Sequence, residues 1–249
     1  MTAPDAQYFD KWYSDLGRSP AHEEIAIQAL GLPPRLESTS LLSWDGIADL
    51  VEAIGVGPGD VLVDLACGRG GYGLEIAHRT GASLIGVDFS AIAIERARQK
   101  ADGSADFRVG ELTATGLPDG LARAVVCIDA MQFADPYEDG IGECRRILAP
   151  GGRLALTGWE PLEPGDEGLP PRMRRDIAAA LQAAGFRDVR VWHMPAWREA
   201  ERRHWDLAVD LDPNGDPALE SLHSEGNRTL PWLDRSRRVL AVGVAPPSS

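Results

Sequence analysis

The sequence predicts an α/β fold built on a seven-stranded, mostly parallel sheet with helices on both faces. Two observations support this prediction. From about residue 58 onward, short apolar runs alternate with helix-like segments, as expected for buried parallel strands joined by crossover helices. In addition, the glycine-rich stretch DLACGRGGYG (64–73) directly follows the first apolar run, at the position where an open parallel sheet has its ligand-binding loop.

Seven segments are expected to be strands because they are short, apolar and bounded by turns. They cover residues 61–65, 83–88, 106–110, 124–129, 153–159, 189–193 and 239–244. Helices are expected between them, near residues 71–80, 90–101, 137–148 and 172–184. Ser90 suits a helix N-cap, and Gly81 and Gly185 suit helix ends.

Two helical regions fall outside this alternation. Residues 1–57 show no strand-like pattern and are expected to form an N-terminal helical cap, followed by a main domain over 58–249. Within the cap, Trp44–Ile54 is predicted to be an amphipathic helix that Gly55 ends. About 45 residues separate the last two predicted strands, and they predict a helical insertion over about 195–237.

The charge of the chain excludes some classes of partner. With 25 basic and 38 acidic residues the formal net charge is −13, so nucleic-acid backbones and anionic membranes would be repelled and neither is expected as a partner. The arginines at 172, 174, 175, 235, 237 and 238 are mixed with acids and are expected on solvated faces. The oligomeric state stays open.

The N-terminus and the cysteines indicate a compartment. The N-terminus lacks the apolar core of a signal peptide, and no apolar run approaches the roughly 18 residues of a membrane span. Cys67, Cys127 and Cys144 lack the spacing of a metal site or a disulfide framework. We therefore expect a soluble cytoplasmic protein with reduced thiols and no bound metal.

Four acidic residues stand at the carboxyl ends of successive predicted strands: Asp64, Asp88, Glu111 and Asp129. Because ligands bind beyond these ends, we expect the four carboxylates to converge on one cleft. The glycine turn spells G-x-G-x-x-G, as dinucleotide-binding loops do, but such a cleft would repel a pyrophosphate and attract the net positive S-adenosylmethionine. The glycine spacing alone leaves an NAD-dependent oxidoreductase as an alternative.

Over about residues 58–158 the chain resembles the class I S-adenosylmethionine-dependent methyltransferases. VLVDLACGRG (61–70) resembles their first motif, GVDFS (86–90) the second, GELTATGLP (110–118) the third and CIDAMQFAD (127–135) the fourth. The resemblance implies S-adenosylmethionine as the cofactor and S-adenosylhomocysteine as its product. A protein that binds this cofactor without transferring the methyl group is the main alternative.

The resemblance also implies roles for single residues. The first-motif turn would lie against the methionine portion of the cofactor, Asp88 would bind both ribose hydroxyls, and Phe89 would lie against adenine. Ala66 stands where the family often has glycine. The expected cofactor-binding residues are Asp64, Ala66, Cys67, Gly68, Gly70, Asp88, Phe89, Gly110, Glu111, Leu112, Asp129, Ala130 and Met131, together with Tyr13, Thr39 and Ser40 from the N-terminal region.

No general base stands out in the sequence. Related small-molecule enzymes often carry two histidines after the fourth-motif acid, whereas this chain has Met131-Gln132-Phe133. Gln132 can orient a polar substrate but cannot accept a proton. His193, which ends the sixth predicted strand, and His22, in the N-terminal region, are the other catalytic candidates, with a purely structural role as the alternative for each.

The tryptophans indicate where a substrate would bind. All seven lie outside residues 58–158, in the N-terminal region and toward the C-terminus. Aromatic-lined concavities suit small organic ligands, although the same rings could simply attach peripheral helices to the sheet. We therefore expect methylation of oxygen, nitrogen or carbon in a small metabolite, driven mainly by positioning in a capped pocket.

Overall fold

The structure, a computed structural model, describes residues 6–16, 19–37, 39–101 and 103–247. Its centre is one sheet with strand order β3-β2-β1-β4-β5-β7-β6, in which β7 runs antiparallel to both neighbours and the other pairs are parallel. The predicted seven-stranded, mostly parallel sheet is therefore confirmed. The strands are β1 (Val61–Leu65), β2 (Ser83–Asp88), β3 (Asp106–Val109), β4 (Ala122–Ile128), β5 (Leu148–Pro161), β6 (Arg187–His193) and β7 (Ser236–Val244).

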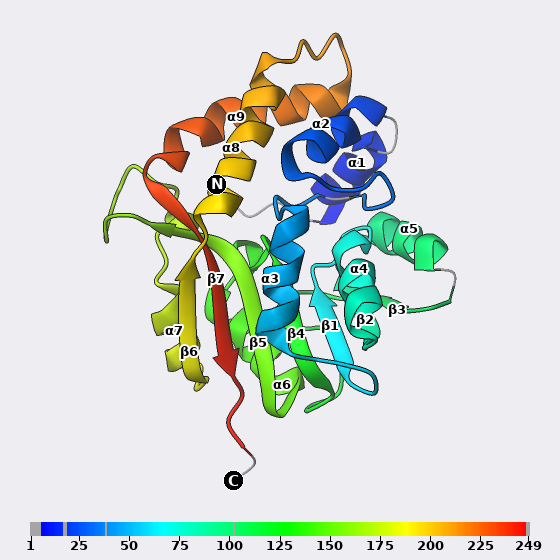
Figure 1. The fold of residues 1–249 in the computed structure, drawn as a ribbon, viewed down its shortest axis with the longest axis vertical. Coiled ribbons are helices and arrows are strands. Elements are labelled where there is room, and N and C mark those ends of the chain that lie inside the picture. The colour runs from blue at the N-terminus through cyan, green and yellow to red at the C-terminus, as the bar shows by residue number, and fades with distance from the viewer. Residues whose placement is uncertain (1–5, 17–18, 38, 102, 248–249) are drawn as a thin grey trace.

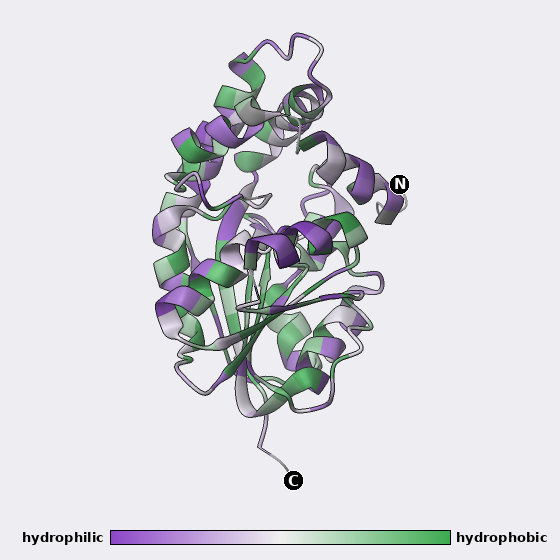
Figure 2. Ribbon diagram, turned by 90° about the vertical axis from the view of Figure 1, so that its right-hand side faces the viewer, coloured by the Kyte–Doolittle hydropathy of each residue, from purple (hydrophilic) through white to green (hydrophobic). Residues whose placement is uncertain are grey.

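Helices cover both faces of the sheet (Figure 1). One face carries α3 (Trp44–Ile54), α4 (Gly71–Thr80) and α5 (Ala91–Ala101), and the other carries α6 (Tyr137–Ile147) and α7 (Ile177–Ala183). Neighbouring strand residues contribute alternately to the two cores: Leu62 packs with the first group and Val63 with the second. Figure 2 shows the hydrophobic residues gathered along the strands between these two layers.

The helix ends follow the expected signals. The Ser90 hydroxyl accepts a hydrogen bond from the Ala93 backbone at 3.1 Å, so the predicted N-cap of α5 is confirmed. Gly81 ends α4 with φ of 75°, a left-handed conformation that glycine adopts without strain.

Helix α3 lies in a different place from the one expected. The sequence assigned it to a cap over residues 1–57, whereas the structure packs it on the sheet, against β5 and β7. The reason is its apolar stripe: Ile47, Leu50 and Ile54 are at most 2% exposed and belong to the core on that face.

Four other helices form a layer at one end of the sheet, which we call the cap. They are α1 (Ala6–Leu16), α2 (Pro20–Leu30), α8 (Pro195–Asp210) and α9 (Pro217–Leu233). The cap lies beyond the carboxyl ends of the parallel strands (Figure 1), and α8 and α9 are the insertion between β6 and β7. Segments from both ends of the chain thus meet above the sheet.

The chain order also fixes where a ligand can bind. The chain runs outward from β1 through β2 to β3 and returns to β4 on the other side of β1, so the crevice of the open sheet lies between β1 and β4. At the ends of these two strands Ala66 and Asp129 adopt left-handed φ angles of 58° and 55°. Across the described residues, no helix has the length and apolar character needed to cross a membrane.

Candidate functional site

A cavity of about 220 Å³ lies at this crevice, beneath the cap. We call it the nucleoside cavity because the residues predicted to hold the adenosine surround it. The predicted cofactor-binding residues on its wall are Tyr13, Thr39, Ser40, Ala66, Asp88, Phe89, Gly110, Glu111, Leu112, Asp129 and Ala130. The positive φ of Ala66 explains why glycine is common at this position: alanine bears a steric cost of about 1–2 kcal/mol there.

Asp88 is the most enclosed acid on this wall, with 3% of its surface exposed. Its carboxylate accepts hydrogen bonds from the backbone N–H of Gly68 at 2.8 Å and of Ser90 at 2.9 Å. Burial raises its pKa, and the two hydrogen bonds oppose that rise. Each carboxylate oxygen retains acceptor capacity, so a pair of ligand hydroxyls can still bind there.

Aromatic rings form the roof of the nucleoside cavity. The Phe9 ring from α1 lies 5.3 Å from the Phe89 ring and 5.8 Å from the Phe133 ring, measured between centroids. These spacings are typical of stabilising aromatic pairs. The cap therefore closes the cavity with apolar surface, opposite the carboxylates of the sheet.

Some predicted residues do not reach the nucleoside cavity: Asp64, Cys67, Gly68, Gly70 and Met131 are absent from its wall. Asp64 is 2% exposed and accepts a hydrogen bond from the Gly73 backbone. Burial first, and the charge of Asp88 second, raise its pKa to about 7. Four carboxylates were expected to converge on one cleft, but only those of Asp88, Glu111 and Asp129 do so. The Asp64 side chain instead lies beneath the glycine turn, against Gly73.

The side chain of Tyr13 covers the glycine turn from above. A Cβ placed on Gly68 would lie 2.8 Å from the Tyr13 hydroxyl oxygen and 3.2 Å from Thr39 Oγ1. Tyr13 is only 5% exposed, and burial and the nearby Asp88 raise the pKa of its hydroxyl. Tyr13 thus lies against the glycine turn, beside which the resemblance places the methionine portion of the cofactor.

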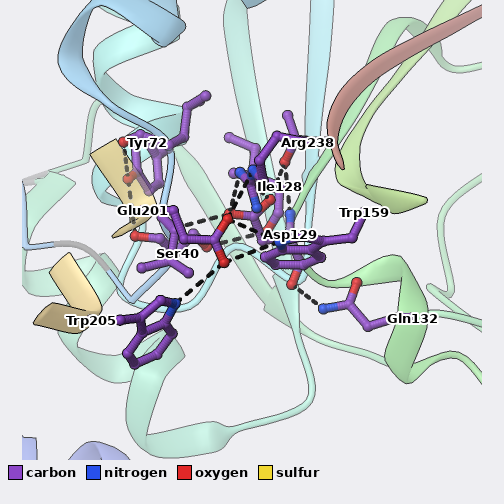
Figure 3. Close-up of polar contacts among 12 residues, drawn as sticks. Ser40, Tyr72, Ile128, Asp129, Gln132, Trp159, Glu201, Trp205 and Arg238 are labelled. Atoms are coloured by element: carbon purple, nitrogen blue, oxygen red, sulfur yellow. Dashed lines mark hydrogen bonds and ion pairs between the residues drawn. The ribbon is translucent and has the colours of Figure 1, made fainter. Parts of the chain in front are cut away.

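Asp129, at the end of β4, is the centre of a buried charge cluster (Figure 3). Its carboxylate accepts hydrogen bonds from Thr157 Oγ1 at 2.6 Å and from the Leu41 backbone at 2.9 Å. The guanidinium of Arg238, on β7, approaches the same carboxylate to 2.8 Å and is completely buried. The charge of Asp129 is therefore balanced inside the protein, and its side chain fixes residues 39–42 against the sheet.

The cluster continues from Arg238 into the cap. Arg238 Nε lies 3.6 Å from the carboxylate of Glu201 on α8, which has no exposed surface. That carboxylate also accepts hydrogen bonds from the indole N–H of Trp159, at 3.0 Å, and of Trp205, at 3.3 Å. Burial raises the pKa of Glu201, and Arg238 opposes the rise.

The buried position of Arg238 corrects the expectation that the C-terminal arginines are solvated. On β7 it points toward Trp159, whose ring centroid lies 4.3 Å from its guanidinium carbon. One feature of the sequence could have indicated this burial: Arg238 stands within the apolar strand SRRVLAVGV (236–244), next to the half-exposed Arg237.

A second cavity, of about 790 Å³, lies between the cap and the sheet. We call it the chamber. Aromatic residues from separate parts of the chain line it, among them Tyr8, Trp159, Trp205 and Trp232. The chamber and the nucleoside cavity share one set of wall residues, namely Phe9, Trp12, Thr39, Ser40, Asp129 and Phe133.

The catalytic candidates fall in different places. Gln132 lines the chamber and donates from Nε2 to the Asp129 backbone oxygen at 2.6 Å. His22 also lines the chamber and is 5% exposed. His193 does not: it ends β6, as expected, but is exposed on this edge strand and borders a separate cavity of about 600 Å³, so the structure does not bring it together with the other two candidates. His204, which the sequence placed only in the insertion, lines the chamber as well.

Among the residues that the structure describes, no group of three or more histidine, cysteine or acidic side chains could hold a metal ion. Cys67, Cys127 and Cys144 are free thiols.

Comparisons with known proteins give a family for part of the chain. Residues 62–152 match the family model described as a methyltransferase domain. The demethylmenaquinone methyltransferase of Thermus thermophilus is 37% identical over 113 residues, which are 43% of this chain and 51% of that protein. The chain thus spans about half the length of this relative.

Solved structures resemble the fold over most of the chain. A Haemonchus contortus phosphoethanolamine N-methyltransferase bound to S-adenosylhomocysteine has a TM-score of 0.73 at 17% identity, covering 94% of this chain and 60% of that one. The (4+2)-cyclase SpnF has a TM-score of 0.75 at 21% identity, covering 100% of this chain and 99% of that one.

Proposed function

We propose that this chain, whose residues 62–152 match a methyltransferase domain, transfers a methyl group from S-adenosylmethionine to oxygen, nitrogen or carbon of a small organic metabolite. The observation that carries this proposal is the contact between two cavities. The nucleoside cavity and the chamber share one wall at the end of β4, so a cofactor in the first would face an acceptor in the second.

The residues of the nucleoside cavity fit this cofactor. Asp88 offers two carboxylate oxygens to the ribose hydroxyls, and Phe89 offers an aromatic face to adenine. Of the acids on the wall, Asp129 is neutralised by Arg238, whereas Asp88, Glu111 and Asp135 leave the cavity negative. This charge favours a cationic cofactor over a dianionic one.

The chamber supplies positioning rather than proton transfer. The cofactor, when bound, provides the sulfonium-activated methyl group. Thr39, Ser40 and Phe133 would hold the acceptor in line with it, and the apolar roof excludes water. The Asp129 carboxylate is fully engaged by protein donors, so we assign it the positioning of residues 39–42. Gln132 can orient a polar acceptor from the same strand end.

Calorimetric titration of the whole chain tests the cofactor assignment. S-adenosylhomocysteine should bind with a measurable dissociation constant, and NADH should not bind. Binding of NADH alone would contradict the proposal. Incubation with S-adenosylmethionine and a panel of phenols, amines and carbon nucleophiles, with S-adenosylhomocysteine detected by mass spectrometry, then tests the transfer.

A second candidate is different chemistry performed with the same cofactor bound. It is favoured by the end-to-end likeness to a cyclase and by the saturated hydrogen bonding of Asp129 on the shared wall. Tight binding of S-adenosylhomocysteine, without its formation from S-adenosylmethionine across the whole panel, would select this candidate.

A further inference from the structure

Two histidines from different helices lie in the wall of the chamber. His22 belongs to α2 and His204 to α8, and these helices pack against each other in the cap. His22 is 5% exposed and His204 is 4% exposed. Neither lines the nucleoside cavity, so both belong to the acceptor side alone.

One ring nitrogen of each histidine lacks a hydrogen-bond partner in the described part of the chain. In the described part of the chain, Nδ1 of His22 and Nδ1 of His204 are buried without a hydrogen bond. Buried polar atoms are almost always paired, so an orphaned atom in a cavity wall indicates a group that a ligand satisfies. Two such atoms on facing helices make that indication stronger than one.

Both imidazoles are uncharged at neutral pH. Burial lowers the pKa of His22 to about 4, with Arg69 lowering it further and Asp216 opposing. Burial lowers the pKa of His204 to about 3, and His22 adds to the effect. A neutral imidazole carries one N–H donor and one bare nitrogen acceptor, so the pair can bind a group that both donates and accepts.

An aromatic ring lies beside each histidine of the pair. The rings of Trp12 and His22 lie 6.4 Å apart, and those of Trp205 and His204 lie 4.9 Å apart, each nearly perpendicular. These rings offer apolar surface beside the two imidazoles, which suits an acceptor with an apolar or aromatic body.

We propose that His22 and His204 determine acceptor specificity, binding an uncharged hydroxyl on an aromatic or alicyclic acceptor at a point remote from the methylated atom. This proposal rests on the proposed function, because it assigns the chamber to the acceptor. The two histidines are positioning residues in it and accept no proton from the reacting atom.

Two probes of similar size test the proposal: 2-naphthol, and 2-methylnaphthalene, in which a methyl group replaces the hydroxyl. Each is titrated into the whole chain saturated with S-adenosylhomocysteine, and binding is followed by quenching of tryptophan fluorescence. Wild-type protein should bind 2-naphthol about tenfold more tightly. The variant H22L/H204L should bind both probes equally.

Two further variants separate a binding role from a structural one. H22Q/H204Q keeps a donor and an acceptor at each position and should restore part of the preference for 2-naphthol. His78→Leu, on the exposed side of α4, is the matched control and should behave as wild type. Leucine removes buried unpaired polar atoms, so H22L/H204L should fold, and thermal unfolding checks this.

The proposal is overturned if wild-type protein binds the two probes equally, fails to bind 2-naphthol, or keeps its preference in H22L/H204L. The proposed function fails separately, when S-adenosylhomocysteine does not bind wild-type protein. Titration of each variant with S-adenosylhomocysteine therefore distinguishes the two failures.

Discussion

The sheet core and the cap are stabilised by different interactions. In the core, apolar strand residues pack against helices on both faces, as Leu62 and Val63 do on opposite sides of β1. The cap is attached over the cleft by ion pairs in which at least one partner is almost completely buried. Arg238 and Glu201 connect the sheet to α8, and Arg69 of the glycine turn pairs with Glu23 of α2.

This difference has a consequence for the cleft. Asp129 and Arg238 link the two regions: Asp129 lies on the wall of both cavities, and its partner Arg238 approaches Glu201 of α8 in the cap. Any change in their charge therefore alters the position of the cap and the electrostatics of the site together.

The largest expected effect comes from removing the buried cation of the cap attachment. Arg238→Met leaves Asp129 and Glu201 buried without a balancing charge, so the free energy of unfolding should fall by about 3–5 kcal/mol in urea titrations. Arg190→Met, on the exposed edge strand β6, is the control and should change it by less than about 0.5 kcal/mol. A small loss for Arg238→Met would show that the apolar contacts of the cap suffice.

A smaller effect, confined to the cap, should appear as a pH dependence. The pKa values of His22 and His204 are lowered in the folded state, so the unfolded chain binds protons first as the pH falls below about 6.5. Stability is therefore lost between pH 6.5 and 4, by about 2 kcal/mol for each histidine at pH 5. H22L/H204L lacks this loss. In urea titrations, its free energy of unfolding relative to that of wild type should therefore be higher at pH 5 than at pH 7. A constant difference would mean that both histidines titrate normally.

In the core, loss of the proposed ribose ligand should affect binding more than folding. Asp88→Ala removes a charge-assisted hydrogen-bond acceptor, so the dissociation constant for S-adenosylhomocysteine should rise about 10- to 150-fold in calorimetry, equivalent to about 1.5–3 kcal/mol. Asp60→Ala, in a turn before β1, should leave it unchanged. Equal affinities for Asp88→Ala and wild type would remove Asp88 from the site.

The smallest expected effect measures the contact between core and cap directly. Gly68→Ala places a methyl group at a left-handed φ of 53° and against the Tyr13 hydroxyl, and should cost about 1–2 kcal/mol of unfolding free energy. Adding Tyr13→Phe removes the close contact, so a double-mutant cycle should show a coupling of about 0.5–1 kcal/mol. Zero coupling would mean that Tyr13 already moves freely above the turn.

The sequence predicts the core more completely than the cap because strand and helix signals are local. The expected strand over 83–88 and the expected helix over 71–80 coincide with β2 and α4, since apolar runs and glycine stops act within a few residues. Asp88 and Phe89 reach the nucleoside cavity as the motif implies. Motif spacing does not give the direction of a side chain, however. Asp64 was expected to face the cleft, but it lies beneath the glycine turn, where it bonds to Gly73.

The cap depends on pairings between residues far apart in the sequence. Arg238 can be buried because it pairs with Asp129 at 2.8 Å, a residue 109 positions earlier, and nothing near Arg238 in the sequence shows this. His22 and His204 line one wall only because α2 and α8 pack together. Helix α3 has an amphipathic pattern that fits a cap or a sheet face equally, so only the three-dimensional packing decides.

Two segments far apart in the sequence, within residues 8–41 and 159–232, supply most of the wall of the chamber. Of its wall, only Asp129, Gln132 and Phe133 fall within residues 62–152. Under the proposed function, exchange of the peripheral helices would therefore change which acceptor fits, while the loops that line the nucleoside cavity stayed as they are.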